Sequence, residues 1–131
     1  CLPSLGDAGA HVSQIMDSGW ATFVLAYWVR ERGLYSLEEA VRRLSAAPAR
    51  VMGLTDRGLL QPGMRGDLNV IDLSALGERM PKIVNDFPGG APRFTQEARG
   101  YKATVCNGEV ILRDDALTGS RGGRVVGPAA A

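Results

Sequence analysis

The tract from Ala47 to Asp72 limits the fold more than any other part of this sequence. Pro48 fits the first turn of a short helix, which Gly53 ends. A Gly-rich turn follows, and the apolar run from Leu68 to Ile71 after it is typical of a strand. The tract therefore predicts that the chain changes from helices to strands near Pro62.

Two longer helices are predicted before Pro62. Apolar residues at helical spacing place the first from Trp20 to about Arg32, and Gly33 ends it. Ser36 begins the second, because Glu39 three residues later completes a capping box. Helical spacing favours core packing of the aromatic side chains over stacking on a ligand. The stripes expected to be buried are Trp20, Phe23, Val24, Tyr27 and Trp28 in the first helix and Leu37, Ala40, Val41 and Leu44 in the second.

Antiparallel strands are predicted in the second half of the chain. The apolar alternation from Tyr101 to Leu112 surrounds Asn107-Gly108, a pair suited to the positive φ angles of a type I′ hairpin. Phe87 to Pro92 is rich in Gly and Pro, which indicates a loop. We expect a last short strand from Arg124 to Val126 and a frayed tail from residue 127 onward.

Composition excludes several classes of partner. The chain has 131 residues, 45% of them hydrophobic, which is enough for the core of one domain. The 15 basic and 14 acidic residues nearly balance, so no basic stripe argues for nucleic acid. No apolar run approaches the roughly 20 residues that a membrane helix needs. Cys1 and Cys106 lack metal-type spacing, and we interpret them as thiols of a cytoplasmic protein.

The segment from Gly6 to His11, GDAGAH, holds the strongest candidate site residues. It joins small residues to Asp7 and to the only histidine of the sequence. Small residues allow a ligand to approach closely, and a carboxylate beside them can bind a metal or accept a proton. Spacing alone, however, favours an aspartate in a Gly-rich turn and a surface histidine.

The order of these motifs resembles the end of a metal-dependent amidohydrolase of the N-acyl-D-amino-acid deacylase branch. The similar segments, from Leu5 to about Val125, are GDAGAH, WATFVLAYWVRERG, SLEEAVRRLSAAPARVMGL, DRGLLQPGMRGDLNVID, NDFPGGAPRF and GYKATVCNGEVILRDDALTG. The resemblance implies an α+β chain. Residues 1–60 would supply the last strand-loop and C-terminal helices of a (β/α)8 barrel, and 61–131 the antiparallel strands of a small β-sandwich domain.

The resemblance also implies roles for individual residues. Asp7 matches the aspartate at the end of the eighth barrel strand, which binds the metal and shuttles a proton from the attacking water to the leaving nitrogen. His11 matches a residue of the substrate-facing loop, although a surface histidine is an open alternative. The implied cofactor is zinc, and the implied reaction is hydrolysis of a small N-acyl amino acid to a carboxylate and a D-amino acid.

The sequence departs from the family pattern in its metal ligands. A catalytic zinc usually takes three protein ligands and a water, but this chain has one histidine and no His-x-His pair. In the family, the remaining ligands and the arginine that holds the substrate carboxylate lie on earlier strands. We therefore expect a C-terminal portion that is inactive alone and completed by the missing N-terminal part or by another subunit. The alternative is a non-catalytic association module, or a partner subunit of another amidohydrolase chain.

Other charged residues are expected to be structural. Asp56 and Arg57 suggest an ion pair or turn at the boundary between the two parts of the chain. Asp67 and Asp72 flank a strand, too far apart for paired acid/base chemistry, and turn capping is favoured. Arg121 to Arg124 could grip a phosphate, but without a phosphate cradle nearby a solvated turn is favoured.

Overall fold

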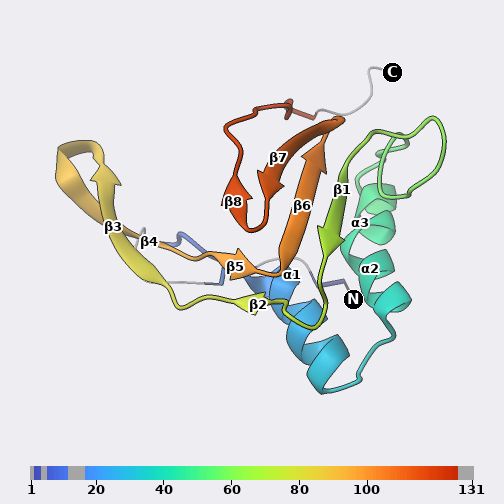
Figure 1. The fold of residues 1–131 in the computed structure, drawn as a ribbon, viewed down its shortest axis with the longest axis horizontal. Helices are drawn as coiled ribbons and strands as arrows, with labels where there is room; N and C mark the ends of the chain where they lie inside the picture. The colour runs from blue at the N-terminus through green and yellow to red at the C-terminus, as the bar shows by residue number, and fades with distance from the viewer. Residues whose placement is uncertain (1, 4–5, 12–16, 127–131) are drawn as a thin grey trace.

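A computed structural model describes residues 2–3, 6–11 and 17–126 of the chain. Helices α1 (Trp20–Phe23), η1 (Val24–Glu31), α2 (Leu37–Leu44) and α3 (Ala46–Val51) precede all the strands. They lie beside one antiparallel sheet, and a long hairpin extends away on the other side (Figure 1). The expected change from helices to antiparallel strands, and hence the α+β class, is confirmed. Within the described ranges, no helix has the length and apolar character to cross a bilayer.

The first helix is present as predicted, but its buried face differs. After one α-helical turn it continues as a π-helix, in which the N–H of Arg32 donates to the carbonyl of Tyr27 at 2.9 Å. Hydrogen bonds five residues apart place more residues in each turn than the about 3.6 of an α-helix, so the apolar stripe shifts. Phe23 and Tyr27 are therefore each 37% exposed and stack on one another at 4.9 Å, while Leu25 is buried.

The second helix begins at Ser36 and the third ends before Gly53, as predicted. Ser36 caps α2 by accepting a hydrogen bond from the Glu39 N–H at 3.2 Å. The Glu39 carboxylate pairs with Arg42 and Arg43, both at 2.7 Å. Gly53, at φ +68, follows α3. The buried stripe of α2 is narrower than expected: Ala40 is fully buried and Leu44 packs on the core, whereas Leu37 and Val41 are 37% and 43% exposed.

The main sheet has the order β1-β6-β7-β8, with all neighbours antiparallel. Its strands are β1 (Leu68–Ile71), β6 (Tyr101–Cys106), β7 (Glu109–Arg113) and β8 (Ala116–Leu117). Asn107 and Gly108 join β6 to β7 at φ +52 and +83, which confirms the predicted type I′ turn. A second tight turn at Asp114 and Asp115, both also at positive φ, leads into β8, which the sequence did not indicate.

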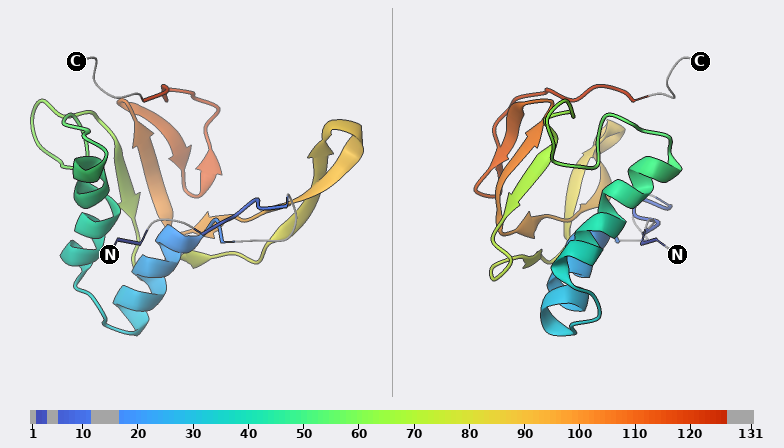
Figure 2. Two further views of the ribbon diagram at one scale, coloured as in Figure 1. Left: turned by 180° about the vertical axis from the view of Figure 1, so that it is seen from behind. Right: turned by 90° about the vertical axis from the view of Figure 1, so that its right-hand side faces the viewer.

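Two short ribbons form the rest of the β structure. β2 (Gly77–Glu78) pairs with β5 (Ala98–Arg99), and β3 (Lys82–Phe87) pairs with β4 (Ala91–Thr95). Figure 2 shows the β3–β4 hairpin projecting from the helices and the main sheet. The loop expected from Phe87 to Pro92 is wrong at both ends, because cross-strand pairing holds all but Pro88–Gly90 in strands.

The C-terminal expectation needs one correction. Arg124 to Val126 is not a strand, because it pairs with no described neighbour. The tail expected from residue 127 onward lies outside the described residues.

The core lies between the helices and the main sheet. Val24, Leu25, Ala40 and Leu76 form its buried centre, with Trp28 among the partly buried residues packed around it. The Thr22 and Tyr101 hydroxyl groups share a hydrogen bond of 2.8 Å and join the first helix to β6. The expectation of an aromatic core therefore holds for Trp28 but is wrong for Tyr27, whose ring faces solvent beside Phe23.

Candidate functional site

Asp7 and His11 lie at the two ends of one exposed turn. The N–H of Ala10 donates to the Asp7 carbonyl at 3.0 Å, which closes the turn. Asp7 and His11 have φ angles of +49 and +52, a left-handed conformation that is uncommon outside glycine and that occurs in turns and functional sites. Neither side chain bonds to another residue in the described part of the chain. The turn therefore presents both groups to solvent, where a ligand or a second domain can reach them.

Backbone contacts position this turn against the rest of the chain. Gly6 lies directly against Asp17, where a Cβ atom on residue 6 would overlap the aspartate backbone. Two residues further on, the Gly19 N–H and the Ser18 hydroxyl donate to Oε1 of Gln96 at 3.2 and 3.3 Å. The segment that carries Asp7 is thus held next to the connection between β4 and β5, and no sequence pattern predicted this contact.

The described residues do not fit a complete zinc site. A catalytic zinc needs about three protein ligands, usually imidazole, thiolate or carboxylate groups. Among residues 2–3, 6–11 and 17–126, no group of three such side chains is close enough to hold a metal ion. Asp7 and His11 can supply one donor each, so any further ligands must come from elsewhere.

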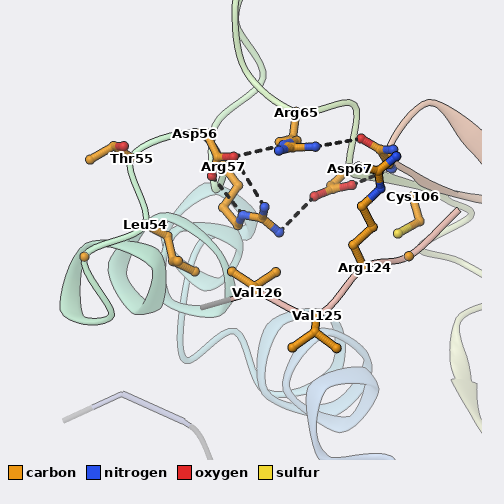
Figure 3. A pocket seen from close by; sticks show the side chains of 13 residues that line it. Leu54, Thr55, Asp56, Arg57, Arg65, Asp67, Cys106, Arg124, Val125 and Val126 are labelled. Carbon is orange, nitrogen blue, oxygen red and sulfur yellow. Dashed lines mark hydrogen bonds and ion pairs between the residues drawn. The ribbon is translucent and has the colours of Figure 1, made fainter. Parts of the chain in front are cut away.

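A second group of charged residues gathers between α3 and the β6–β7 turn (Figure 3). Arg57 Nε lies 3.0 Å from Asp56 Oδ1, which confirms the predicted ion pair. Arg65 Nε lies 2.9 Å from the other oxygen of the same carboxylate, and Arg65 Nη1 donates to Oδ1 of Asn107 at 3.0 Å. Hydrogen bonds from Arg57 and Arg65 lower the pKa of Asp56 to about 2. Sequence reasoning missed Arg65, because only the folded Gly-rich turn brings it to Asp56.

The flanking aspartates cap turns, as predicted. Asp67 accepts the Asn107 N–H at 2.7 Å, and Asp72 accepts the Ser74 and Ala75 N–H groups at 3.0 and 3.2 Å. Hydrogen bonds from Ser74 and Ala75 lower the pKa of Asp72. Each of the two carboxylates thus accepts hydrogen bonds from backbone N–H groups, as a turn cap does.

The sequence pattern of the Amidohydrolase family matches residues 6–112, which include the Asp7 turn, the helices and the β6–β7 hairpin. The chain belongs to the amidohydrolase family. It is 45% identical to an N-acyl-D-glutamate deacylase of Alcaligenes xylosoxydans xylosoxydans over an alignment of 112 residues that covers 77% of this chain and 22% of that protein. A D-aminoacylase of the same organism is 33% identical over 114 residues, covering 86% of this chain and 22% of that protein.

A solved D-aminoacylase structure shares the arrangement of this amidohydrolase chain. That structure, described for the functional role of its binuclear metal center, has a TM-score of 0.63 and 29% identity, over 81% of this chain and 21% of its own. The amidohydrolase chain therefore spans about a fifth of the length of the relatives that it matches.

Proposed function

We propose that this chain is the C-terminal portion of a metal-dependent enzyme that hydrolyses the linear amide of an N-acyl-D-amino acid. The products are a carboxylate and a D-amino acid. The likeness to an N-acyl-D-glutamate deacylase and to a D-aminoacylase carries the proposal. The exposed Asp7 turn supports it, because a carboxylate held open at the surface can join a site built by other parts of an enzyme.

The proposed domain organisation follows the change of secondary structure. Residues 1–60 would close a (β/α)8 barrel, and 61–131 would form part of a β-sandwich domain. The helices that precede Pro62 and the antiparallel strands that follow it support this boundary. The exposed aromatic rings of Phe23 in α1 and Tyr27 in η1 suit a face that packs on further barrel helices.

Asp7 is the proposed catalytic residue of this chain and one of its metal ligands. A carboxylate can take a proton from the attacking water and return it to the leaving nitrogen. Zinc would be held in part by Asp7, with further ligands from the rest of the enzyme, and would supply Lewis-acid activation of the water. His11 is proposed to contact the substrate, because it lies on the same exposed turn as Asp7.

A chimera tests the proposed function. The region of the N-acyl-D-glutamate deacylase that matches this chain is replaced by the chain, and zinc-dependent release of D-glutamate is measured. We expect activity in the chimera and a loss of about 100-fold or more on Asp7→Asn, the effect expected when a proton-transfer group is removed. Asp114→Asn, which changes an exposed aspartate that also has a positive φ but lies in the turn between β7 and β8, serves as the matched control and keeps activity.

The isolated chain is expected to be inactive. Among residues 2–3, 6–11 and 17–126, no three side chains that bind metals lie close enough together to hold an ion, which supports this expectation. Zinc-dependent hydrolysis by the purified 131-residue chain would contradict this expectation.

A non-catalytic association module is the second candidate. The exposed apolar side chains favour it, including Leu60 at 79% and Met80 at 84% exposure, because such surface suits contact with another protein. A chimera that folds and binds zinc but hydrolyses nothing would favour this candidate over the first.

A further inference from the structure

An open cavity of about 410 Å³ lies where the C-terminal segment passes the charged cluster between α3 and the β6–β7 turn. Its volume falls in the range of about 300–1,000 Å³ that is usual for small-molecule sites. The cavity lies away from the Asp7 turn, because none of residues 6–11 lines it. Figure 3 shows a charged end, with Asp56, Arg65 and Asp67, and an aliphatic end at Leu54 and Val126.

The charges that line the cavity do not cancel. Three arginines, Arg57, Arg65 and Arg124, face two aspartates, which leaves one net positive charge. Arg57 and Arg65 are held by carboxylates: Arg57 contacts Asp56 at 3.0 Å and Asp67 at 3.5 Å, and Arg65 contacts Asp56 at 2.9 Å. These residues therefore form a fixed, nearly neutral wall.

Arg124 supplies the uncompensated charge. It makes no hydrogen bond or ion pair to any residue that the structure describes, although its side chain extends toward the charged end of the cavity (Figure 3). A guanidinium group presents its donors as a planar fork that matches a carboxylate in a bidentate pair. A single free guanidinium suits one negative charge better than the two of a phosphate.

We propose that this cavity binds a small aliphatic carboxylate, with Arg124 pairing to the carboxylate group. The aliphatic part of the ligand lies against Leu54, which is partly buried, and Val126, which is 47% exposed without a ligand. This binding site is independent of the proposed hydrolase function, since it uses neither Asp7 nor a metal.

Titration of the purified 131-residue chain with butyrate tests the site, monitored by the amide NMR signals of Asn107 and Gly123, which line the cavity. We expect saturable shifts with butyrate and none with butylammonium, which has a similar chain but the opposite charge. Arg124→Gln is expected to weaken binding by about tenfold or more, as the loss of a charged hydrogen-bond pair implies.

Arg121→Gln is the matched control, because it removes the same charge from the same segment but does not line the cavity. It is expected to leave binding unchanged. Butyrate is also expected to slow alkylation of Cys106, which lines the cavity, in the parent chain but not in Arg124→Gln. The proposal is overturned if butyrate gives no saturable shift, if butylammonium binds equally well, or if the two arginine variants behave alike.

Discussion

Gly100 is restricted by both its backbone conformation and its neighbours. Its φ angle of +92 lies in the region that L side chains rarely adopt. A Cβ atom there would lie 2.7 Å from the Cα atom of Leu76, a fully buried core residue. Gly108 shares the positive φ, at +83, but has nothing within 4 Å of its would-be Cβ. A side chain at position 108 would therefore meet backbone strain only, whereas one at position 100 would meet both backbone strain and steric overlap.

Alanine at each position should reveal this difference. We expect Gly108→Ala to lower the free energy of unfolding by about 1 kcal/mol, from left-handed strain alone. Gly100→Ala should lower it by about 3 kcal/mol or more, because overlap with core backbone is added to that strain. Urea denaturation followed by circular dichroism measures both values, and equal losses would show that the contact with Leu76 relaxes without cost.

Residue-level predictions succeeded where the signal was local. Two motifs of four residues or fewer predicted local structure that is present. The pair Asn107-Gly108 predicted a tight turn, and Ser36 with Glu39 predicted the start of a helix. The need for glycine at position 100 depends on Leu76, which approaches only in the folded chain. The exposed positions of Asp7 and His11 likewise follow from the turn around them, whereas their chemical roles rest on resemblance.

At the scale of elements, the charged residues around Asp56 join the loop that follows α3 to the main sheet. Asp56 pairs with Arg57 and Arg65, and the Arg65 N–H also donates to the Asp56 carbonyl at 2.8 Å. Arg65 then reaches Asn107 in the β6–β7 turn. One carboxylate thus connects the helical part of the chain to the hairpin, and its protonation should loosen that connection.

The sign of the pH effect follows from the pKa of Asp56. The arginines lower this pKa from 3.8 to about 2, so the unfolded chain binds a proton more readily than the folded one. The stability that Asp56 contributes is present above about pH 4 and is lost as the pH falls toward 2.

Urea midpoints of the parent chain and of Asp56→Asn should therefore differ at pH 5 and converge toward pH 2. Glu39, whose pKa is also lowered to about 2, titrates in both proteins and cancels in the comparison. Asp114→Asn should show no comparable convergence. A constant difference between parent and Asp56→Asn across this range would contradict the prediction.

Prediction of individual elements failed where a strand depends on pairing with a neighbouring strand and not on its own residue pattern. β3 and β4 lie on either side of Pro88–Gly90, and neither segment has a sequence pattern that predicts a strand without its partner. The π-helical winding of η1 moved the apolar stripe away from Phe23 and Tyr27, because the expected stripe assumed α-helical spacing. β8 depends on the turn at Asp114 and Asp115, which reads as an ordinary loop in sequence.

At the scale of the whole molecule, the chain consists of a packed body and a projecting arm. The body joins the helices to the main sheet through the core around Leu76. The arm is the β3–β4 hairpin, whose main contacts are between its own strands (Figures 1 and 2). Asp86 pairs with Arg93 across the hairpin at 2.6 Å, and the other ion pair of the arm joins Lys82 at its base to Glu97, two residues beyond β4, at 3.5 Å. An isolated two-stranded hairpin is at best marginally stable in water, so the arm should open more readily than the body.

Hydrogen exchange measured by mass spectrometry checks this difference. Amides of β3 and β4 should exchange much faster than those of β6, an inner strand that pairs with β1 and β7. The β6–β7 hairpin provides an internal comparison of similar length. Equal protection of the two hairpins would mean that something further, such as a second molecule, covers the arm.

The irregular edges of the arm have a practical consequence. Pro92 removes a backbone donor from β4, and the pairing of β3 shifts between Val84 and Phe87, so neither edge offers a regular template to another strand. Gly89 and Gly90 form the tip, with open space around both. An affinity tag or fluorophore inserted there would stand clear of the core, and the chain could be tethered to a surface by the tip of the arm.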